Sequence, residues 1–89
     1  MSEPDPPTWW LYLLRSAAGR FYVGISNDLV RRLAQHNGEQ PGGAKATRAG
    51  RPWQIVRRWG PFAHDQAARL ECDLKRRRGV KRLDWDPEA

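Results

Sequence analysis

Residues 10–37 carry the pattern from which the fold can be predicted: Trp10-Leu-Tyr-Leu-Leu-Arg15, then Phe21-Tyr-Val-Gly-Ile25, then the basic segment Arg31-Arg-Leu-Ala-Gln-His-Asn37. Residues 9–15 are apolar on both alternating faces, which is typical of a central strand covered on both sides. Ser16-Ala-Ala-Gly19 supplies a turn, and residues 20–25 return as a second strand. We therefore predict an antiparallel hairpin.

Each strand of this hairpin carries one tyrosine, Tyr12 and Tyr22. With a loop of about three or five residues the two tyrosines lie opposite each other on one face, with Cβ atoms ~5 Å apart. A four-residue loop places them on opposite faces, and the sequence leaves this choice open. Gly24 shares the face of Tyr22, and a glycine inside a strand marks a bulge or the close approach of another group.

A short helix follows the hairpin. Ser26 or Asn27 can cap it, and Asp28 favours its positive end. At 100° per residue, Arg32 and His36 lie together on one flank of the apolar stripe, whereas Arg31 points to solvent. The predicted stripe consists of Leu29, Val30, Leu33 and Ala34.

Residues 37–52 form a long glycine-rich loop, which in a compact domain is usually functional or mobile. Lys45, Arg48 and Arg51 could contact phosphates there, or the loop could be a flexible basic connector. The third strand is expected over residues 53–59, with alternation up to Trp59 and an end at Gly60-Pro61.

A second helix is expected from about residue 65 to residue 78, stopped by Gly79. Its apolar stripe consists of Ala67, Leu70 and Leu74, and Leu83 and Trp85 are expected to pack back onto the core. The predicted order of elements is β-β-α-β-α, which places the chain in the α+β class.

The 89 residues predict one small domain over residues 9–86, after a loose N-terminal tail over residues 1–8. Sixteen Lys and Arg against ten Asp and Glu give a formal charge of +6, which favours a polyanionic partner, usually nucleic acid. The single cysteine, Cys72, excludes an internal disulfide and a multi-cysteine zinc site. No segment is apolar enough for a membrane span or a signal peptide, so we expect a cytoplasmic protein that does not bind membranes.

Glu71 is the acidic residue that lies beside an apolar helical stripe. It could form an ordinary ion pair with Lys75 four residues on, or it could bind a divalent metal ion, since hard cations take carboxylate ligands. Arg32 with His36 is equally ambiguous alone, and paired tyrosines in a hairpin are more often core than catalyst.

Taken together, these residues resemble the GIY-YIG nuclease family, and in particular its small single-domain bacterial members. The resemblance rests on Tyr22-Val-Gly24, the arginine eight residues later, and His36-Asn37. It extends to Gly43-Ala-Lys-Ala-Thr-Arg48 and to Ala67-Ala-Arg-Leu-Glu-Cys-Asp-Leu-Lys75, and it covers roughly residues 9–83. The first motif reads Trp10-Leu-Tyr-Leu instead of Gly-Ile-Tyr, but it keeps the tyrosine.

The resemblance implies a small three-stranded antiparallel sheet flanked by helices, in agreement with the predicted order of elements. It also implies metal-assisted hydrolysis of phosphodiester bonds, with DNA as the expected substrate. Glu71 would hold one Mg²⁺ or Mn²⁺, and Arg32 would bind the scissile phosphate. Tyr12 would orient or deprotonate the attacking water, with Tyr22 and His36 close by. Gly24 would let the phosphate approach the strand, and Lys45, Arg48 and Arg51 would contact the substrate.

Two hypotheses follow: a structure-specific or weakly specific DNA endonuclease in repair or processing, and a nucleic-acid-binding module with a decayed site. The endonuclease requires a divalent metal ion, whereas the binding module does not cleave. Because a chain this small leaves no room for a separate recognition domain, we expect any sequence-specific targeting to need a protein partner.

Overall fold

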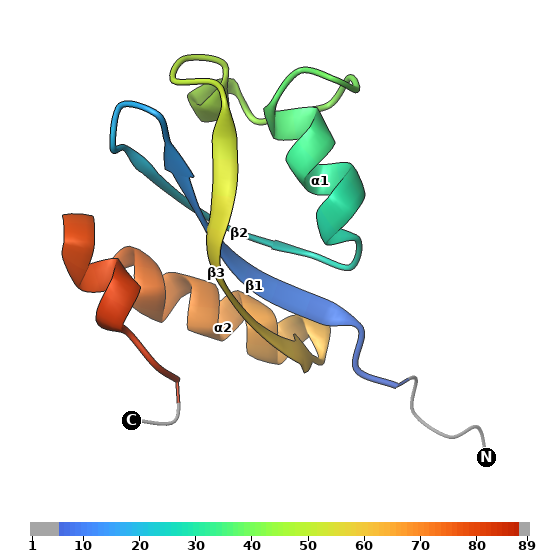
Figure 1. The fold of residues 1–89 in the computed structure, drawn as a ribbon. Coiled ribbons are helices and arrows are strands. Elements are labelled where there is room, and N and C mark those ends of the chain that lie inside the picture. The colour runs from blue at the N-terminus through green and yellow to red at the C-terminus, as the bar shows by residue number, and fades with distance from the viewer. Residues whose placement is uncertain (1–5, 88–89) are drawn as a thin grey trace.

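The computed structural model describes residues 6–87, so residues 1–5 of the predicted tail lie outside the described part, as do residues 88–89. Figure 1 shows the chain as a three-stranded antiparallel sheet with helices packed on it. The elements are β1 (Trp9–Ser16), β2 (Phe21–Ser26), α1 (Leu29–His36), η1 (Lys45–Thr47), β3 (Trp53–Phe62), α2 (His64–Lys75) and η2 (Gly79–Asp84). The α+β class and the order β-β-α-β-α are confirmed.

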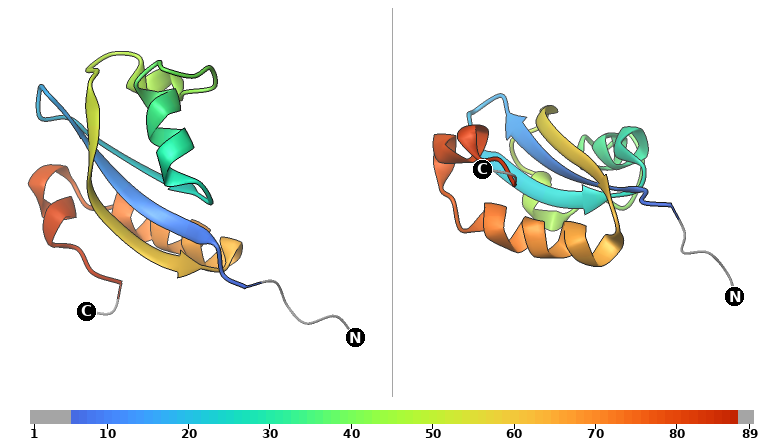
Figure 2. Two further views of the ribbon diagram at one scale, coloured as in Figure 1. Left: turned by 45° about the vertical axis from the view of Figure 1, so that its right-hand side comes forward. Right: turned by 90° about the horizontal axis from the view of Figure 1, so that it is seen from below.

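The central strand, β1, pairs with β2 on one side and with β3 on the other. Its side chains alternate between two cores, because successive residues of a strand point to opposite faces. Leu11 and Leu13 pack with α2, whereas Tyr12 and Leu14 pack with α1 and the start of β3. Figure 2 shows α2 running across one face of this sheet. All four side chains are almost fully buried, as expected for a strand that is apolar on both faces.

The third strand departs from the predicted simple alternation. A register shift between Leu13 and Leu14 makes β3 irregular near Val56, so Trp53 and Ile55 join the α1 face whereas Trp59 joins the α2 face. The strand also runs on to Phe62, past the predicted end at Gly60-Pro61. A second register shift accommodates these residues, and Gly60 there takes a φ of +136°.

The helices are close to the predicted ones, with three corrections. Asp28, and not Ser26 or Asn27, is the N-cap of α1, since its carboxylate accepts the Arg31 N–H at 3.1 Å. Val30 is 84% exposed, because the short helix turns only Leu29 and Leu33 onto the sheet. The helix α2 ends at Lys75, three residues before the predicted end, and η2 then begins at Gly79.

The helix α2 and the segment after it pack onto the core as predicted. Ala67 and Leu74 of α2 are fully buried, and Leu70 packs against the same core. Trp85 folds back so that its ring lies edge-on to Trp59, with 5.2 Å between the ring centroids. Among residues 6–87, no helix is long and apolar enough to cross a membrane.

Candidate active site

Both tyrosines lie on the face of the sheet that α1 covers. Tyr12 is opposite Gly24, and Tyr22 is opposite Leu14, so the two tyrosines are diagonal neighbours. Residues on diagonally related positions of one face are within reach of long aromatic side chains. Of the two arrangements that the sequence left open, the hairpin therefore has both tyrosines on one face, offset by two residues from a directly opposed pair.

Gly24 makes room for the ring of Tyr12. A Cβ atom added at Gly24 would lie 2.6 Å from Tyr12 Cζ and still nearer to the hydroxyl oxygen. Because carbon atoms in contact normally stay about 3.5 Å apart, no side chain fits at residue 24. The close approach that this glycine signals is thus made by the tyrosine of the neighbouring strand. Gly24 is not open to a phosphate on the side where Tyr12 lies.

The Tyr12 hydroxyl begins a chain of buried hydrogen bonds. Its oxygen lies 2.8 Å from His36 Nε2, and His36 Nδ1 lies 2.8 Å from Thr47 Oγ1. The Thr47 hydroxyl in turn donates to the carbonyl oxygen of Ala44 at 2.8 Å. Tyr12, His36 and Thr47 are each no more than 2% exposed. The ring of Tyr22 lies against His36 as well, with 4.9 Å between the ring centroids.

Burial keeps Tyr12 and His36, the two ionisable groups in this series of hydrogen bonds, neutral. It raises the pKa of Tyr12 to about 12; the hydrogen bonding and charge of Arg32 oppose this rise, while Tyr22 and Glu71 add to it. Burial lowers the pKa of His36 to about 4, and the nearby charges of Arg32 and Arg51 lower it further. At neutral pH the site therefore holds a phenol and a neutral imidazole.

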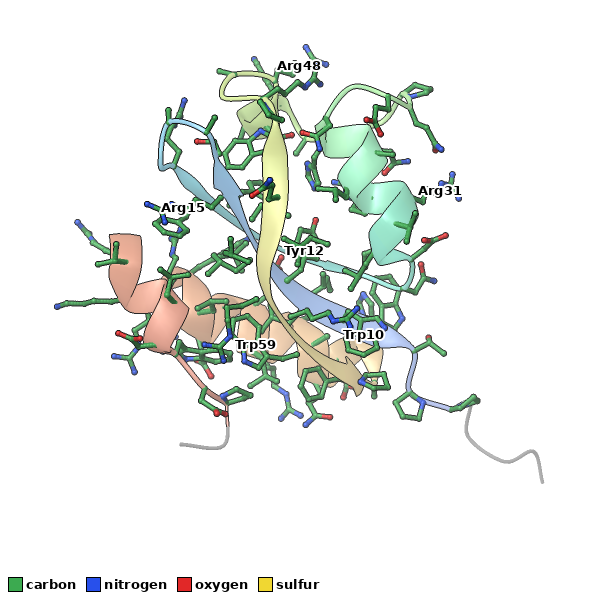
Figure 3. All side chains as sticks on the ribbon, viewed as in Figure 1. Trp10, Tyr12, Arg15, Arg31, Arg48 and Trp59 are labelled. Atoms are coloured by element: carbon green, nitrogen blue, oxygen red, sulfur yellow. The ribbon has the colours of Figure 1, made fainter. Side chains whose placement is uncertain are left out.

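Arg32 and Arg31 differ as the helical wheel predicts. Arg31 is exposed and points away from the sheet into solvent (Figure 3). Arg32 is half-buried, and its Nη1 donates to Gln35 Oε1 at 2.9 Å and to Gly42 O at 2.8 Å. These two bonds fix one edge of the guanidinium. The hydrogen bonding and positive charge of Arg32 lower the pKa of Tyr12, against the larger effect of burial.

Glu71 comes from the other side of the sheet, on α2. It forms the i,i+4 ion pair with Lys75 at 3.6 Å, and its side chain is 22% exposed. An exposed pair of this kind contributes little to stability. The charge of Glu71 adds to the rise in the pKa of Tyr12, after the larger effects of burial, Arg32 and Tyr22.

The donor set suits a metal ion that the substrate helps to bind. No group of three or more His, Cys, Asp or Glu residues that could hold a metal ion occurs in the described part of the chain. Glu71 offers a partly exposed carboxylate, and Mg²⁺ typically takes one or two carboxylates together with substrate phosphates and waters. The site thus fits an ion held between Glu71 and a phosphate, and it does not fit a closed protein cage.

The basic residues of the long loop divide into two kinds. Lys45 and Arg48 are exposed, and Arg48 projects from the end of the molecule near η1 (Figure 3). Arg51 instead turns back to α1, where its Nε donates to the carbonyl oxygen of His36 at 2.8 Å. Since Arg51 satisfies a carbonyl at the end of α1, its first role is to fix the loop against the helix.

Two polar residues of the site were missed in the sequence. Gln35 holds Arg32, and Thr47 holds His36. Thr47 belongs to the Gly43–Arg48 segment, but a hydroxyl in a loop without periodicity gives no sign that it will be fully buried.

Comparison with known families identifies the same domain. The model of the GIY-YIG catalytic domain matches residues 8–83. A UPF0213 protein of Xanthomonas axonopodis pv. citri is 40% identical over 77 residues, which cover 86% of this chain and 74% of that protein. A UPF0213 protein of Serratia proteamaculans is 45% identical over 71 residues, which cover 78% of this chain and 66% of that protein.

A further relative has a functional name. Structure-specific endonuclease subunit SLX1 homolog 1 of Trypanosoma cruzi is 37% identical over 94 residues, covering 84% of this chain. The chain spans 18% of the length of that much longer protein. The resemblance to small stand-alone GIY-YIG proteins is confirmed.

Proposed function

Because this chain belongs to the GIY-YIG nuclease family, we propose that it is a metal-dependent endonuclease that hydrolyses phosphodiester bonds in DNA. The proposed substrates are branched or otherwise irregular DNA structures, cut with weak or no sequence preference during repair or processing. The name of the Trypanosoma cruzi relative supports structure-specific cleavage, although it belongs to a far longer protein.

The observation that supports this proposal most is the hydrogen bond of the buried Tyr12 hydroxyl to His36, together with the charges that act on that hydroxyl. His36 is hydrogen-bonded to it, while the charges of Arg32 and Glu71 both act on its pKa. A buried phenol, with a cation and a carboxylate whose charges act on it, supplies the kinds of group that phosphodiester hydrolysis needs: one to handle the water, one to bind the phosphate and one to hold a metal ion.

In the proposed reaction Arg32 binds the scissile phosphate. Its guanidinium is a planar fork of donors that suits phosphate oxygens, and its bonds to Gln35 and Gly42 hold it in place before substrate arrives. A fixed positive charge stabilises the extra negative charge of the pentacovalent transition state without further reorganisation.

Tyr12 handles the attacking water in this proposal. Because its pKa is about 12, the hydroxyl remains protonated at neutral pH and first acts by orienting the water. To take a proton from the water, it must release its own, and His36 Nε2 lies 2.8 Å away along the hydrogen bond. Tyr22, packed on the His36 ring, keeps the imidazole in place.

Glu71 would hold the divalent metal ion, Mg²⁺ or Mn²⁺. When bound, such an ion supplies Lewis-acid stabilisation of the leaving oxygen. The exposed Lys45 and Arg48, with the formal charge of +6, would attract the DNA backbone, so binding should weaken steeply as salt rises.

A cleavage panel tests the proposal. Purified protein is incubated with four-way junctions, flaps, single-stranded and duplex DNA, and the matching RNAs, each with Mg²⁺, Mn²⁺ or EDTA. We expect nicking of at least one DNA structure that EDTA abolishes. Salt-sensitive binding without cleavage in either metal would instead identify a binding module with a decayed site.

A further inference from the structure

Thr47 is a buried residue that contacts His36 and has no step of its own in the proposed reaction. Its hydroxyl is fully buried and lies between two groups, the Ala44 carbonyl oxygen and His36 Nδ1, each at 2.8 Å. Two oxygen atoms at that separation need a proton between them, and a carbonyl oxygen has none. The single proton of the Thr47 hydroxyl is therefore directed at Ala44.

The direction of the Thr47–Ala44 bond determines the direction of the Thr47–His36 bond. Toward His36, the Thr47 oxygen can act solely as an acceptor, so Nδ1 must carry the imidazole proton. A neutral imidazole has one N–H, which leaves Nε2 as an acceptor. The Tyr12 hydroxyl, 2.8 Å from Nε2, must then be the donor in their bond.

The direction of the Tyr12–His36 bond also determines what the Tyr12 oxygen can accept. When the Tyr12 proton points at His36, the lone pairs of the phenol oxygen are free to accept from Arg32 and from a water molecule. With the other tautomer, Nε2–H would donate to Tyr12, and Nε2 could not receive the phenol proton. Tyr12 could then not pass its own proton to His36 when it takes one from the water.

Thr47 is itself held firmly. Trp53 Nε1 donates to the backbone carbonyl of Thr47 at 2.8 Å, and Trp53 is buried in the same core as Tyr12. The loop residue is thus fixed to the start of β3, on the opposite side of the histidine from the tyrosine.

We propose that Thr47 is a positioning residue that selects the Nδ1–H tautomer of His36 and thereby makes the Tyr12 oxygen a hydrogen-bond acceptor for the reaction. This inference rests on the proposed nuclease function for its catalytic meaning. Its structural part, the tautomer, can be measured without any activity.

The first test is the tautomer of the unaltered protein. The chain has two histidines, so ¹⁵N-labelled histidine gives two sets of ring signals, and the exposed His64 serves as the internal reference. Long-range ¹H–¹⁵N spectra at neutral pH should show His36 with a protonated Nδ1 and a bare Nε2. A protonated Nε2 in the unaltered protein would overturn the proposal without any variant.

The second test uses three variants. Thr47→Val keeps the shape and removes the hydroxyl, Thr47→Ser keeps the hydroxyl, and Ser16→Ala removes a buried hydroxyl that accepts from the Arg20 N–H instead of from His36. We expect Thr47→Val to lose the single-tautomer pattern and about 10- to 100-fold of the cleavage rate with little change in KM. Thr47→Ser should keep both, and Ser16→Ala should keep the tautomer and the rate.

These outcomes separate the proposed role of Thr47 from the proposed nuclease function. If Thr47→Val keeps the Nδ1–H tautomer, or changes the tautomer without slowing cleavage, the proposed role of Thr47 is wrong. Should Thr47→Val fail to fold, Thr47→Ser and the unaltered protein still decide through their spectra. If no DNA is cleaved under any condition, the nuclease function fails, while the spectra still show whether Thr47 sets the His36 proton.

Discussion

Replacing Gly24 by alanine tests the packing on which the whole site depends. The new Cβ would lie 2.6 Å from Tyr12 Cζ, whereas such carbon atoms need about 3.5 Å, so the ring must move by about 0.9 Å. Because the 2.8 Å bond between Tyr12 and His36 depends on the position of this ring, a shift of that size weakens or breaks it.

The expected loss of stability can be worked from these two effects. Overpacking costs about 1–3 kcal/mol, and leaving buried polar groups without partners costs about 1–3 kcal/mol. Replacing a strand glycine normally gains about 0.5–1 kcal/mol, which is too little to compensate. We therefore expect Gly24→Ala to lower the free energy of unfolding by at least about 1 kcal/mol and by up to about 5 kcal/mol.

Urea titration and thermal melting measure this loss, and a domain of this size should melt about 4–8 °C lower for each kcal/mol. Gly79→Ala is the matched control, because Gly79 has a φ of +56° but nothing within 4 Å of an added Cβ. It reports backbone strain alone, about 1–2 kcal/mol. If Gly24→Ala proves neutral or stabilising, the ring of Tyr12 does not lie over residue 24 and the reasoning is refuted.

Three further predictions use the same assays. Tyr12→Phe keeps the ring but leaves His36 Nε2 without its donor, so the protein should lose about 1–3 kcal/mol and its cleavage activity; unchanged cleavage would contradict the assigned role. Because the pKa of His36 falls from 6.5 to about 4 on folding, the unfolded chain binds the proton better, and stability should decline as the pH falls from 6.5 toward 4, by up to about 3 kcal/mol. Urea titrations across that range measure the slope, which the exposed-residue variant His64→Gln should retain. Asn37→Ala removes two bonds between α1 and β3, at 3.0 and 2.6 Å, and should cost about 1–3 kcal/mol without changing the His36 tautomer.

The sequence predicted the features that follow from periodicity. A strand apolar on both faces had to be central, and β1 is. The helical wheel separated Arg32 from Arg31 because a rotation of 100° per residue is enough to tell a flank from a solvent face. The same reasoning placed Leu70 and Leu74 of α2 on the core.

Features that depend on register and on loop conformation were less accessible. The diagonal placement of Tyr12 and Tyr22 depends on a turn that the sequence did not specify, and the irregularity near Val56 depends on how β3 pairs with β1. Val30 was assigned to the buried stripe because periodicity cannot show how far an eight-residue helix rolls on its sheet. Thr47 was missed because a hydroxyl shows its role only through its partners.

The adjacent arginines of α1 allow the most direct measurement of the central claim, that this surface cleaves DNA. Arg32→Ala removes the cation near Tyr12, whereas Arg31→Ala removes the same charge from a solvent-facing position one residue away. With a DNA structure that the unaltered protein nicks in Mn²⁺, we expect Arg32→Ala to lose about 100-fold or more of the rate and Arg31→Ala to stay near the unaltered rate. Equal rates for the two variants would show that the reaction does not take place at this site.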